Sequence, residues 1–332
     1  MNFIYHYCSI NAFYLIMQNK CIRLSDLNKT NDYMEKRWSK KYIQEVLKEE
    51  LNNYNINLNL KDYYINNEAN KSYLEYYNEE MNKVLFDNRP ILSTCFSEEK
   101  DKLSQWRAYG QDGEGLSIGF DFKVIKQVKN KNILVEKVIY REDKQKKRLG
   151  EIVRSSIKSM EKKYYNIEKK HSIDFDRFFK ENFNIFCKIL IAKLENISCV
   201  IKNPAFSEEK EVRIIYDPEM FNPEINGPIS ICESKRFFEK ELFIKGYKIT
   251  PIKFILRKNQ LIAYCNIDFS GYISDVIIRE IIIGPKCKLS KMDLYYFLLE
   301  NGYDSNKIEI IKSKATYRQI FYKLLKNLYF MI

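Results

Sequence analysis

Hydrophobic positions recur with two different periods along the chain, which predicts an alternation of strands and helices. Near the amino end, an apolar strand over residues 2–7 leads to Ser9, which is expected to cap a helix that ends at Lys20. Further helices are expected over residues 290–301 and after Thr316. Runs of alternating or β-branched residues predict the other strands, over residues 21–24, 91–96, 116–122, 133–140, 211–216, 247–255, 276–283 and 308–311.

Two polar, lysine-rich segments interrupt this succession of strands. The first, near residues 33–83, places Tyr42 and Val46 at helical spacing. The second, near residues 143–200, has no proline and a single glycine, and its apolar residues also recur at helical spacing. Because strands are expected on both sides of each segment, the pattern favours one α+β domain over residues 1–332, with one mixed sheet and two helical insertions.

The composition is that of a folded, basic protein. The 332 residues carry a formal charge of +12, with 45% hydrophobic and 30% charged residues. The positive charge favours an acidic partner such as a nucleotide or a nucleic acid, although the lysines are spread along the chain. The eight cysteines include no Cys-X-X-Cys pair, which disfavours a zinc site, and no metal is expected.

The cysteines and the amino-terminal segment both bear on location. Most cysteines lie in apolar runs, where a free thiol behaves as a small buried hydrophobe. The first residues lack a basic leader before their apolar stretch, and no run reaches the length that crosses a bilayer. We therefore expect a cytoplasmic protein with no signal peptide and no membrane partner, and its oligomeric state stays open.

Two strands carry polar side chains among apolar neighbours. His6 stands in the segment YHYCS, just before the capped helix, where it could donate to a ligand hydroxyl or phosphate. The alternative is a buried imidazole whose nitrogens are both satisfied. Ser93 and Thr94 lie toward the end of the strand over residues 91–96, where such residues also serve as turn formers.

An aromatic and glycine-rich segment follows. Trp106 and Tyr109 lie in the run WRAYG, and Gly113 and Gly115 come before the next strand. Either aromatic ring could stack on a base, and the glycines allow backbone amides to approach a ligand or simply make a tight connection. The segment is not a P-loop, because the Lys-Ser/Thr ending is missing.

Two glutamates precede a predicted strand. Residues two apart on a strand share a face, so Glu209 and Glu211 can point together while Val212 and Ile214 enter the core. Paired carboxylates suit a site that stabilises a developing cation and activates a nucleophile. The alternative is a solvated acidic turn in which Glu211 pairs with Arg213.

These polar residues are separated widely along the chain. Isolated polar groups in apolar strands need a shared reason, so we expect them to line a single concave site. The residues expected to meet there are His6, Ser93, Trp106 and Glu211.

Six segments occur in a fixed order along the chain: YHYCS, RLSDLNKTND, STCFSEEKDKLSQWRAYGQDGEGLSIGFD, FSEEKEVRIIY, IIIGP and KSKATYR. In this order they resemble the bacterial domain-of-unknown-function family 2971, from residue 4 to about residue 318. The name of that family implies no activity.

A second resemblance, to ADP-ribosyltransferases, does imply one. Three groups of residues follow the order of that superfamily's motifs: His6, then Ser93 with Thr94, then Glu209 with Glu211. The resemblance implies a mixed, mostly antiparallel sheet of the ADP-ribosyltransferase kind and NAD as the substrate. A ribose of NAD would be held by His6 and Ser93, and Thr94 would be a further NAD-binding residue. Glu211 would stabilise the ribosyl cation, and Glu209 would orient or deprotonate the acceptor.

The function implied by this resemblance is NAD consumption. The enzyme would transfer ADP-ribose to a protein or nucleic acid, or hydrolyse NAD, in the setting of a bacterial toxin or anti-phage effector. Two alternatives remain. The positive charge and the 14% of aromatic residues are also compatible with a non-catalytic nucleic-acid-binding module. A metal-dependent nuclease would use the abundant carboxylates, although no familiar two-metal pattern stands out.

Overall fold

The chain folds into an α+β structure with one large sheet. In the computed structural model, twelve strands of the described residues form this sheet, and two further strands form a small separate hairpin. The structure describes residues 2–29, 37–56, 63–65, 68–71, 77–79, 90–130, 132–167, 174–217, 240–272 and 277–317.

The large sheet is mixed and mostly antiparallel. Its strand order is β14-β13-β6-β1-β5-β2-β12-β10-β9, while β8 pairs with β5 and β7, and β11 pairs with β12. Among the described strand pairs, β13 and β14 run parallel and the others antiparallel. The strands are β1 (Phe3–Cys8), β2 (Cys21–Asp26), β5 (Leu92–Ser97), β6 (Leu116–Asp121), β7 (Ile133–Lys137), β8 (Glu211–Tyr216), β9 (Leu242–Ile244), β10 (Tyr247–Ile249), β11 (Lys253–Arg257), β12 (Gln260–Asp268), β13 (Ile278–Ile283) and β14 (Glu309–Lys312), with β3 (Tyr63–Ile65) and β4 (Glu68–Lys71) in the hairpin.

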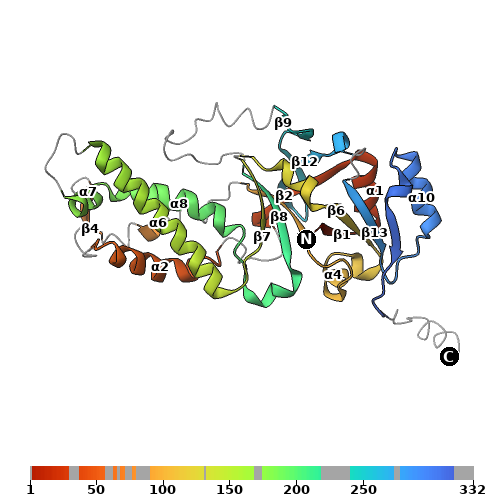
Figure 1. Cartoon of the computed structure of the whole chain (residues 1–332), viewed down its shortest axis with the longest axis horizontal. Helices are drawn as coiled ribbons and strands as arrows, with labels where there is room; N and C mark the ends of the chain where they lie inside the picture. Colours follow the sequence, from red (N-terminus) through yellow and green to blue (C-terminus); the bar gives the residue numbers. More distant parts are fainter. Residues whose placement is uncertain are drawn as a thin grey trace.

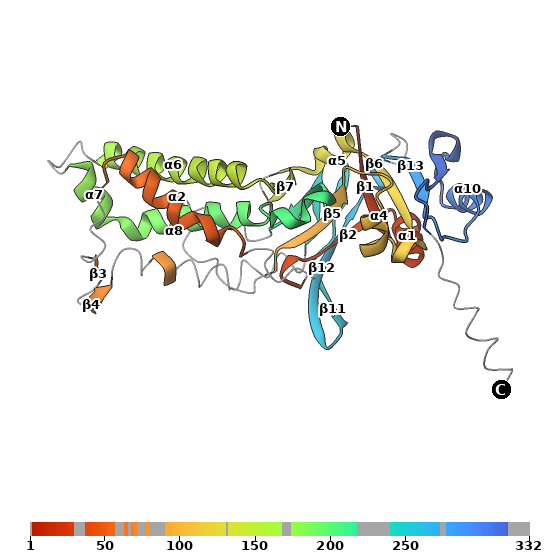
Figure 2. The same cartoon turned by 90° about the horizontal axis from the view of Figure 1, so that it is seen from below.

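The helices gather at the two ends of the sheet. Figures 1 and 2 both show α2, α6, α7 and α8 as a bundle that extends beyond β7 and β8, whereas α1 and α10 lie at the opposite end. The α-helices are α1 (Ile10–Asn19), α2 (Lys40–Asn53), α4 (Leu103–Ala108), α5 (Phe122–Ile125), α6 (Glu142–Ile167), α7 (Phe175–Glu181), α8 (Phe183–Ser198) and α10 (Lys291–Glu300). The 3-10 turns are η1 (Leu27–Lys29), η2 (Gln111–Gly113), η3 (Lys126–Val128), η5 (Pro204–Glu209), η6 (Ser270–Tyr272) and η7 (Ser305–Lys307).

Two large hydrophobic cores and a small third cluster of Tyr5, Tyr7, Trp106 and Ile282 hold the described layers together. The first lies on one face of the sheet, where alternate strand residues such as Ile4, Phe96 and Ile118 pack with α1 and α10. The second lies between α2, α6 and α8, and it takes in Ile215 of β8. Because Ile215 and Ile214 point to opposite faces of the same strand, β8 contributes to both cores and joins the helical bundle to the sheet.

Most of the predicted elements are present, with shifted ends. Ser9 caps α1 as expected, because its side chain accepts a hydrogen bond from the backbone N–H of Ala12. The predicted strand over residues 247–255 is broken between β10 and β11, where Pro251 has no N–H to offer the ladder. The long strand β12 was not predicted, and the helix expected after Thr316 falls almost wholly outside the described residues.

The second lysine-rich segment is mainly helical where the structure describes it, whereas the first combines a helix with a small β-hairpin. The first contains α2 together with the hairpin of β3 and β4, and the second contains α6, α7 and α8. None of the described helices has the length and apolar character needed to cross a bilayer.

Candidate functional site

The register of the sheet decides which of the expected site residues share a face. Tyr5 of β1 stands opposite Ser97 of β5, and Ser97 stands opposite Glu211 of β8. Directly opposed residues on neighbouring strands point the same way. These three side chains therefore share one face of the sheet, which we call the Glu211 face. His6 follows Tyr5 in β1 and points to the opposite face.

His6 is part of the hydrophobic side of the sheet. Its ring meets the ring of Phe96 edge-on with 5.7 Å between centroids, and its Nδ1 lies 3.0 Å from the carbonyl oxygen of Cys95. Burial lowers the pKa of His6, so the ring is neutral near pH 7 and Nδ1 donates its proton to that carbonyl. The expectation that His6 and Glu211 meet in one site is therefore wrong.

Ser93 and Thr94 point to opposite faces of the sheet. Ser93 stands opposite Ile215 on the Glu211 face, and its buried Oγ has no hydrogen-bond partner. It is four residues from Ser97 along β5, which corresponds to about 13 Å at the usual rise of a strand. Thr94 is buried on the opposite face of the sheet. Ser93 thus shares a face with Glu211 without adjoining it, and Thr94 does not share that face.

Trp106 is a core residue. Its side chain is 0% exposed, its Nε1 donates to Asp101 Oδ1 at 2.7 Å, and its ring meets the ring of Tyr7 edge-on at 4.8 Å. A Cβ on Gly110 would lie 2.6 Å from the ring, which explains the glycine at that position. The expectation that Trp106 stacks on a bound base is therefore wrong, because no face of its ring is open.

Replacement of Trp106 by alanine should accordingly destabilise the fold. The lost packing is expected to lower the free energy of unfolding by about 3–5 kcal/mol, as measured by urea denaturation. Tyr165, which is 67% exposed, provides the control, because its alanine variant should stay within about 0.5 kcal/mol of the parent protein. A Trp106→Ala variant as stable as the parent would contradict the buried role.

Four charged side chains meet where β8 begins, and we call them the charged cluster. Lys202 Nζ lies 2.6 Å from Glu209 Oε2 and 2.9 Å from Glu211 Oε1. Arg213 Nε donates to Glu211 Oε2 at 2.6 Å, and Arg213 Nη1 donates to the carbonyl oxygen of Cys199 at 2.7 Å. None of these four side chains is more than 11% exposed. Glu211 is thus paired with Arg213, as the alternative interpretation held, but the pair is buried rather than solvated.

Two tyrosines complete the charged cluster. The hydroxyl of Tyr109 donates to Glu209 Oε1 at 2.9 Å, and the hydroxyl of Tyr140 accepts the backbone N–H of Glu211 at 3.1 Å. Burial raises the pKa of both phenols, so both stay protonated at neutral pH. Tyr109 is 45% exposed, which makes the Tyr109–Glu209 pair the side of the cluster nearest to solvent.

The surroundings give the carboxyl groups of Glu209 and Glu211 different pKa values. Burial, and then the neighbouring Glu211, raise the pKa of Glu209 to about 7, although Lys202 acts in the opposite direction. Burial alone would also raise the pKa of Glu211, but Arg213 and Lys202 hold it at about 2. Near pH 7 Glu211 is therefore ionised, while Glu209 exchanges its proton readily.

Sequence reasoning missed Lys202 and Tyr140. Lys202 directly follows the apolar run Cys199–Ile201 and precedes Asn203 and Pro204. A lysine that directly follows a buried apolar run can itself be buried, and a buried lysine almost always has an acidic partner. The position of Lys202 is therefore a sequence signal for a buried ion pair. Tyr140 gave no comparable signal among the 25 tyrosines of the chain.

A repeated hexapeptide lies beside the charged cluster. The pattern Phe-Ser-Glu-Glu-Lys followed by an acidic residue occurs at Phe96–Asp101 and again at Phe206–Glu211. The two copies are in contact, because Ser97 Oγ donates to the carbonyl oxygen of Glu209 at 2.8 Å and the N–H of Glu98 donates to that of Lys210 at 3.0 Å. These bonds fix the backbone that carries Glu209.

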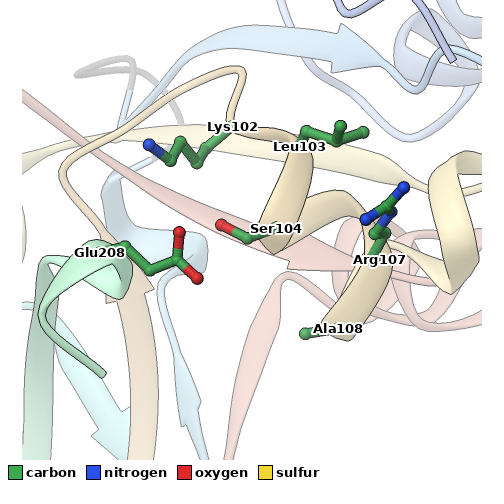
Figure 3. Close-up of a pocket in the computed structure, with 6 residues that line it drawn as sticks. All are labelled: Lys102, Leu103, Ser104, Arg107, Ala108 and Glu208. Atoms are coloured by element: carbon green, nitrogen blue, oxygen red, sulfur yellow. The ribbon is translucent and has the colours of Figure 1, made fainter. Parts of the chain in front are cut away.

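An open pocket of about 570 Å³ lies between α4 and η5. Figure 3 shows Ser104 and Glu208 pointing toward one another across it. Ala108 and Glu208, which line the pocket, directly precede Tyr109 and Glu209 in the chain. The pocket is therefore next to the solvent side of the charged cluster. Its lining residues are Lys102, Leu103, Ser104, Arg107, Ala108 and Glu208.

The fold and the site together define an α+β protein that holds, where strand β8 begins, a buried pair of carboxylates of unequal acidity beside a pocket. Residues 105–214 match the model of a family described as a protein of unknown function (DUF2971). This match is narrower than the resemblance from residue 4 to about residue 318, but it contains all of Tyr109, Tyr140, Lys202, Glu209, Glu211 and Arg213. No curated protein and no solved structure matches the chain. The ADP-ribosyltransferase resemblance therefore depends on the order of motifs alone.

The part of the chain that the structure describes offers no set of donors for a metal ion. No three His, Cys, Asp or Glu side chains gather there in positions that could hold a metal ion. Within the charged cluster, Lys202 and Arg213 are the counter-ions of the two carboxylates.

Proposed function

We propose that this protein is an enzyme that cleaves the N-glycosidic bond of NAD, with Glu209 as the general base and with water or a macromolecule as the acceptor. The observation that carries the proposal is the unequal acidity of Glu209 and Glu211, whose carboxyl groups share Lys202. A pair of titratable groups whose surroundings push their pKa values apart is a frequent arrangement for acid–base catalysis.

The reaction needs one general base whose pKa lies near 7. The bond between the ribose carbon and the nicotinamide nitrogen breaks, and both electrons leave with the nicotinamide, which becomes neutral. The ribose carbon then shares a positive charge with the ring oxygen. A water molecule forms the new bond to that carbon and gives its proton to the Glu209 carboxylate. The products are nicotinamide, ADP-ribose and a proton.

The contacts of Glu211 favour a positioning role over the stabilisation of the ribosyl cation that its place in the motif order implies. Both of its carboxylate oxygens are held by cations, Oε1 by Lys202 and Oε2 by Arg213. Glu209 shares Lys202 through Oε2, but its Oε1 is held by the neutral hydroxyl of the half-exposed Tyr109. A carboxylate held by two cations, as Glu211 is, positions its neighbours and helps to raise the pKa of Glu209. We therefore assign the contact with substrate to Glu209 and a positioning role to Glu211.

NAD is the proposed substrate for two reasons. The motif order resembles that of ADP-ribosyltransferases, and the net charge of +12 favours a substrate that carries phosphates. The leaving group of NAD also needs no proton, so a single base suffices for the reaction.

The proposal is tested by following nicotinamide release from NAD by the purified protein over a range of pH. Glu209 must be deprotonated to act as a base, and its pKa is about 7. The rate should therefore fall about tenfold for each pH unit below 7 and level off above pH 8.

Two results would contradict the proposal. Absence of nicotinamide release, both alone and with candidate protein and nucleic acid acceptors added, would exclude NAD chemistry. A rate that is constant between pH 5 and pH 8 would leave Glu209 without a role as the base. In the first case, tight and salt-sensitive binding of single-stranded nucleic acid would favour the non-catalytic binding module instead.

A further inference from the structure

The pocket between α4 and η5 has features of a binding site in its own right. We infer that it is a subsite for a ribose phosphate group, in which Lys102 and Arg107 bind the phosphate oxygens and Glu208 with Ser104 binds the ribose hydroxyls. The inference deepens the proposed function, since a ribose phosphate bound there would belong to the substrate of Glu209.

The two cations of the pocket are not held in ion pairs with described residues, although the Asp112 carboxylate interacts electrostatically with Arg107. No carboxylate of the described residues pairs with Lys102 or Arg107, although both are exposed. Most other cations around this site do have acidic partners, among them Lys100 with Glu280. The two positive charges lie at the two ends of α4 and extend away from one another (Figure 3). They therefore suit a ligand with two phosphate groups, such as ADP-ribose, in which each phosphate accepts from one cation.

Local contacts fix the backbone of Lys102 and the side chain of Arg107. The backbone N–H of Lys102 donates to the hydroxyl of Tyr7 at 3.0 Å, which anchors the start of α4 to β1. The guanidinium of Arg107 lies 5.1 Å from the centroid of the Tyr317 ring. A guanidinium held over an aromatic ring keeps its donors in one plane, which suits it to a phosphate.

A hydroxyl on α4 and a carboxylate on η5 add a different chemistry to the pocket. Ser104 Oγ is buried and has no hydrogen-bond partner, and no described cation pairs with the exposed carboxylate of Glu208. The two groups point toward one another across the pocket (Figure 3). A carboxylate repels an inorganic anion but accepts hydrogen bonds from hydroxyl groups. The pocket therefore fits a ligand that combines phosphate with hydroxyl donors better than a phosphate alone.

Size and position agree with a nucleotide. A volume of about 570 Å³ lies within the roughly 300–1,000 Å³ of small-molecule sites. Leu103 and Ala108 add apolar surface to the lining. Ala108 and Glu208 of the lining adjoin Tyr109 and Glu209 in sequence, so a ribose in this pocket would lie next to the two segments that carry the proposed base and its hydrogen-bond partner.

The test is direct binding, measured by calorimetry with ADP-ribose, inorganic pyrophosphate and a single-stranded oligoribonucleotide as separate probes. Lys102→Met and Arg107→Met should each weaken ADP-ribose binding by about tenfold or more. Lys291→Met is the matched control, because it removes one exposed lysine charge on α10, at the opposite end of the sheet from the charged cluster. Its affinity for ADP-ribose should equal that of the parent protein.

The Glu208→Gln variant tests the binding of the ribose hydroxyls separately from the binding of the phosphate. It should weaken the binding of ADP-ribose while leaving the binding of pyrophosphate unchanged or stronger, since a repelling charge is removed. If pyrophosphate and ADP-ribose bind equally well to the parent protein, the hydroxyl half of the subsite is refuted. If the oligoribonucleotide binds more tightly than ADP-ribose and loses affinity in Lys102→Met, the pocket binds a nucleic acid backbone and the nucleotide subsite is refuted.

Failure of this inference and failure of the proposed function give different results. If NAD is never cleaved but ADP-ribose binding depends on Lys102 and Arg107, the subsite stands and the proposed reaction fails. If NAD is cleaved but Lys102→Met binds ADP-ribose as well as Lys291→Met does, the reaction stands and the subsite fails.

Discussion

Substitution of Glu209 by glutamine should lower the rate of nicotinamide release from NAD by about 10²–10⁴-fold, the usual contribution of a general base. Glutamine has nearly the same shape and can still accept the hydrogen bond from Tyr109, whose hydroxyl lies 2.9 Å from Glu209 Oε1. It cannot take a proton from water. The loss should therefore appear in kcat, with little change in the binding of ADP-ribose or in Tm.

The matched control for this variant is Glu300→Gln. Glu300 is an exposed residue at the end of α10, so its variant removes the same charge without touching the charged cluster, and its kcat should be unchanged. The pH profile gives a second check, since the fall in rate below pH 7 should vanish from any residual activity of Glu209→Gln. A Glu209→Gln variant that keeps the kcat and the pH profile of the parent protein would exclude Glu209 as the base.

Substitution of Arg213 by methionine should have the largest effect on stability. Arg213 has a side chain that is 1% exposed, and it is bonded to Glu211 and to the carbonyl oxygen of Cys199. Removal of one partner from a buried ion pair leaves a buried charge without compensation, which costs about 3–5 kcal/mol. Lys202 alone would then face Glu209 and Glu211.

Urea denaturation at pH 7 measures this effect, and a double-mutant cycle identifies its cause. The second variant, Glu211→Gln, removes the stranded charge, so the Glu211→Gln/Arg213→Met protein should be more stable than Arg213→Met alone. Arg141→Met is the control, since Arg141 pairs with Asp143 at the surface and such pairs contribute about 0–1 kcal/mol. If Arg213→Met costs no more than Arg141→Met, the charged cluster does not support the fold as described.

The sequence by itself determined many of the elements of this fold, although not β12. Alternation of apolar residues predicted β1, β5, β6 and β8 because each of these strands buries at least one face in a core. The Ser9 cap and the helical spacing of α6 and α8 were likewise visible, since caps and amphipathic faces depend on residues only a few positions apart. Glu209 and Glu211 were found as a pair for the same reason.

The tertiary structure decided which residues share a site. Alternation along β1 shows that Tyr5 and His6 point to opposite faces, but the pairing with β5 and β8 determines which of them joins Glu211. A shift of one residue in that pairing would exchange the two faces, and nothing local to β1 sets it. A contact of the same long range brings Tyr109 to Glu209. Lys202 is only seven residues from Glu209 in sequence, but the packing of α8 and η5 against the sheet decides that the two side chains meet. The local pattern therefore signals a buried lysine without identifying its partner.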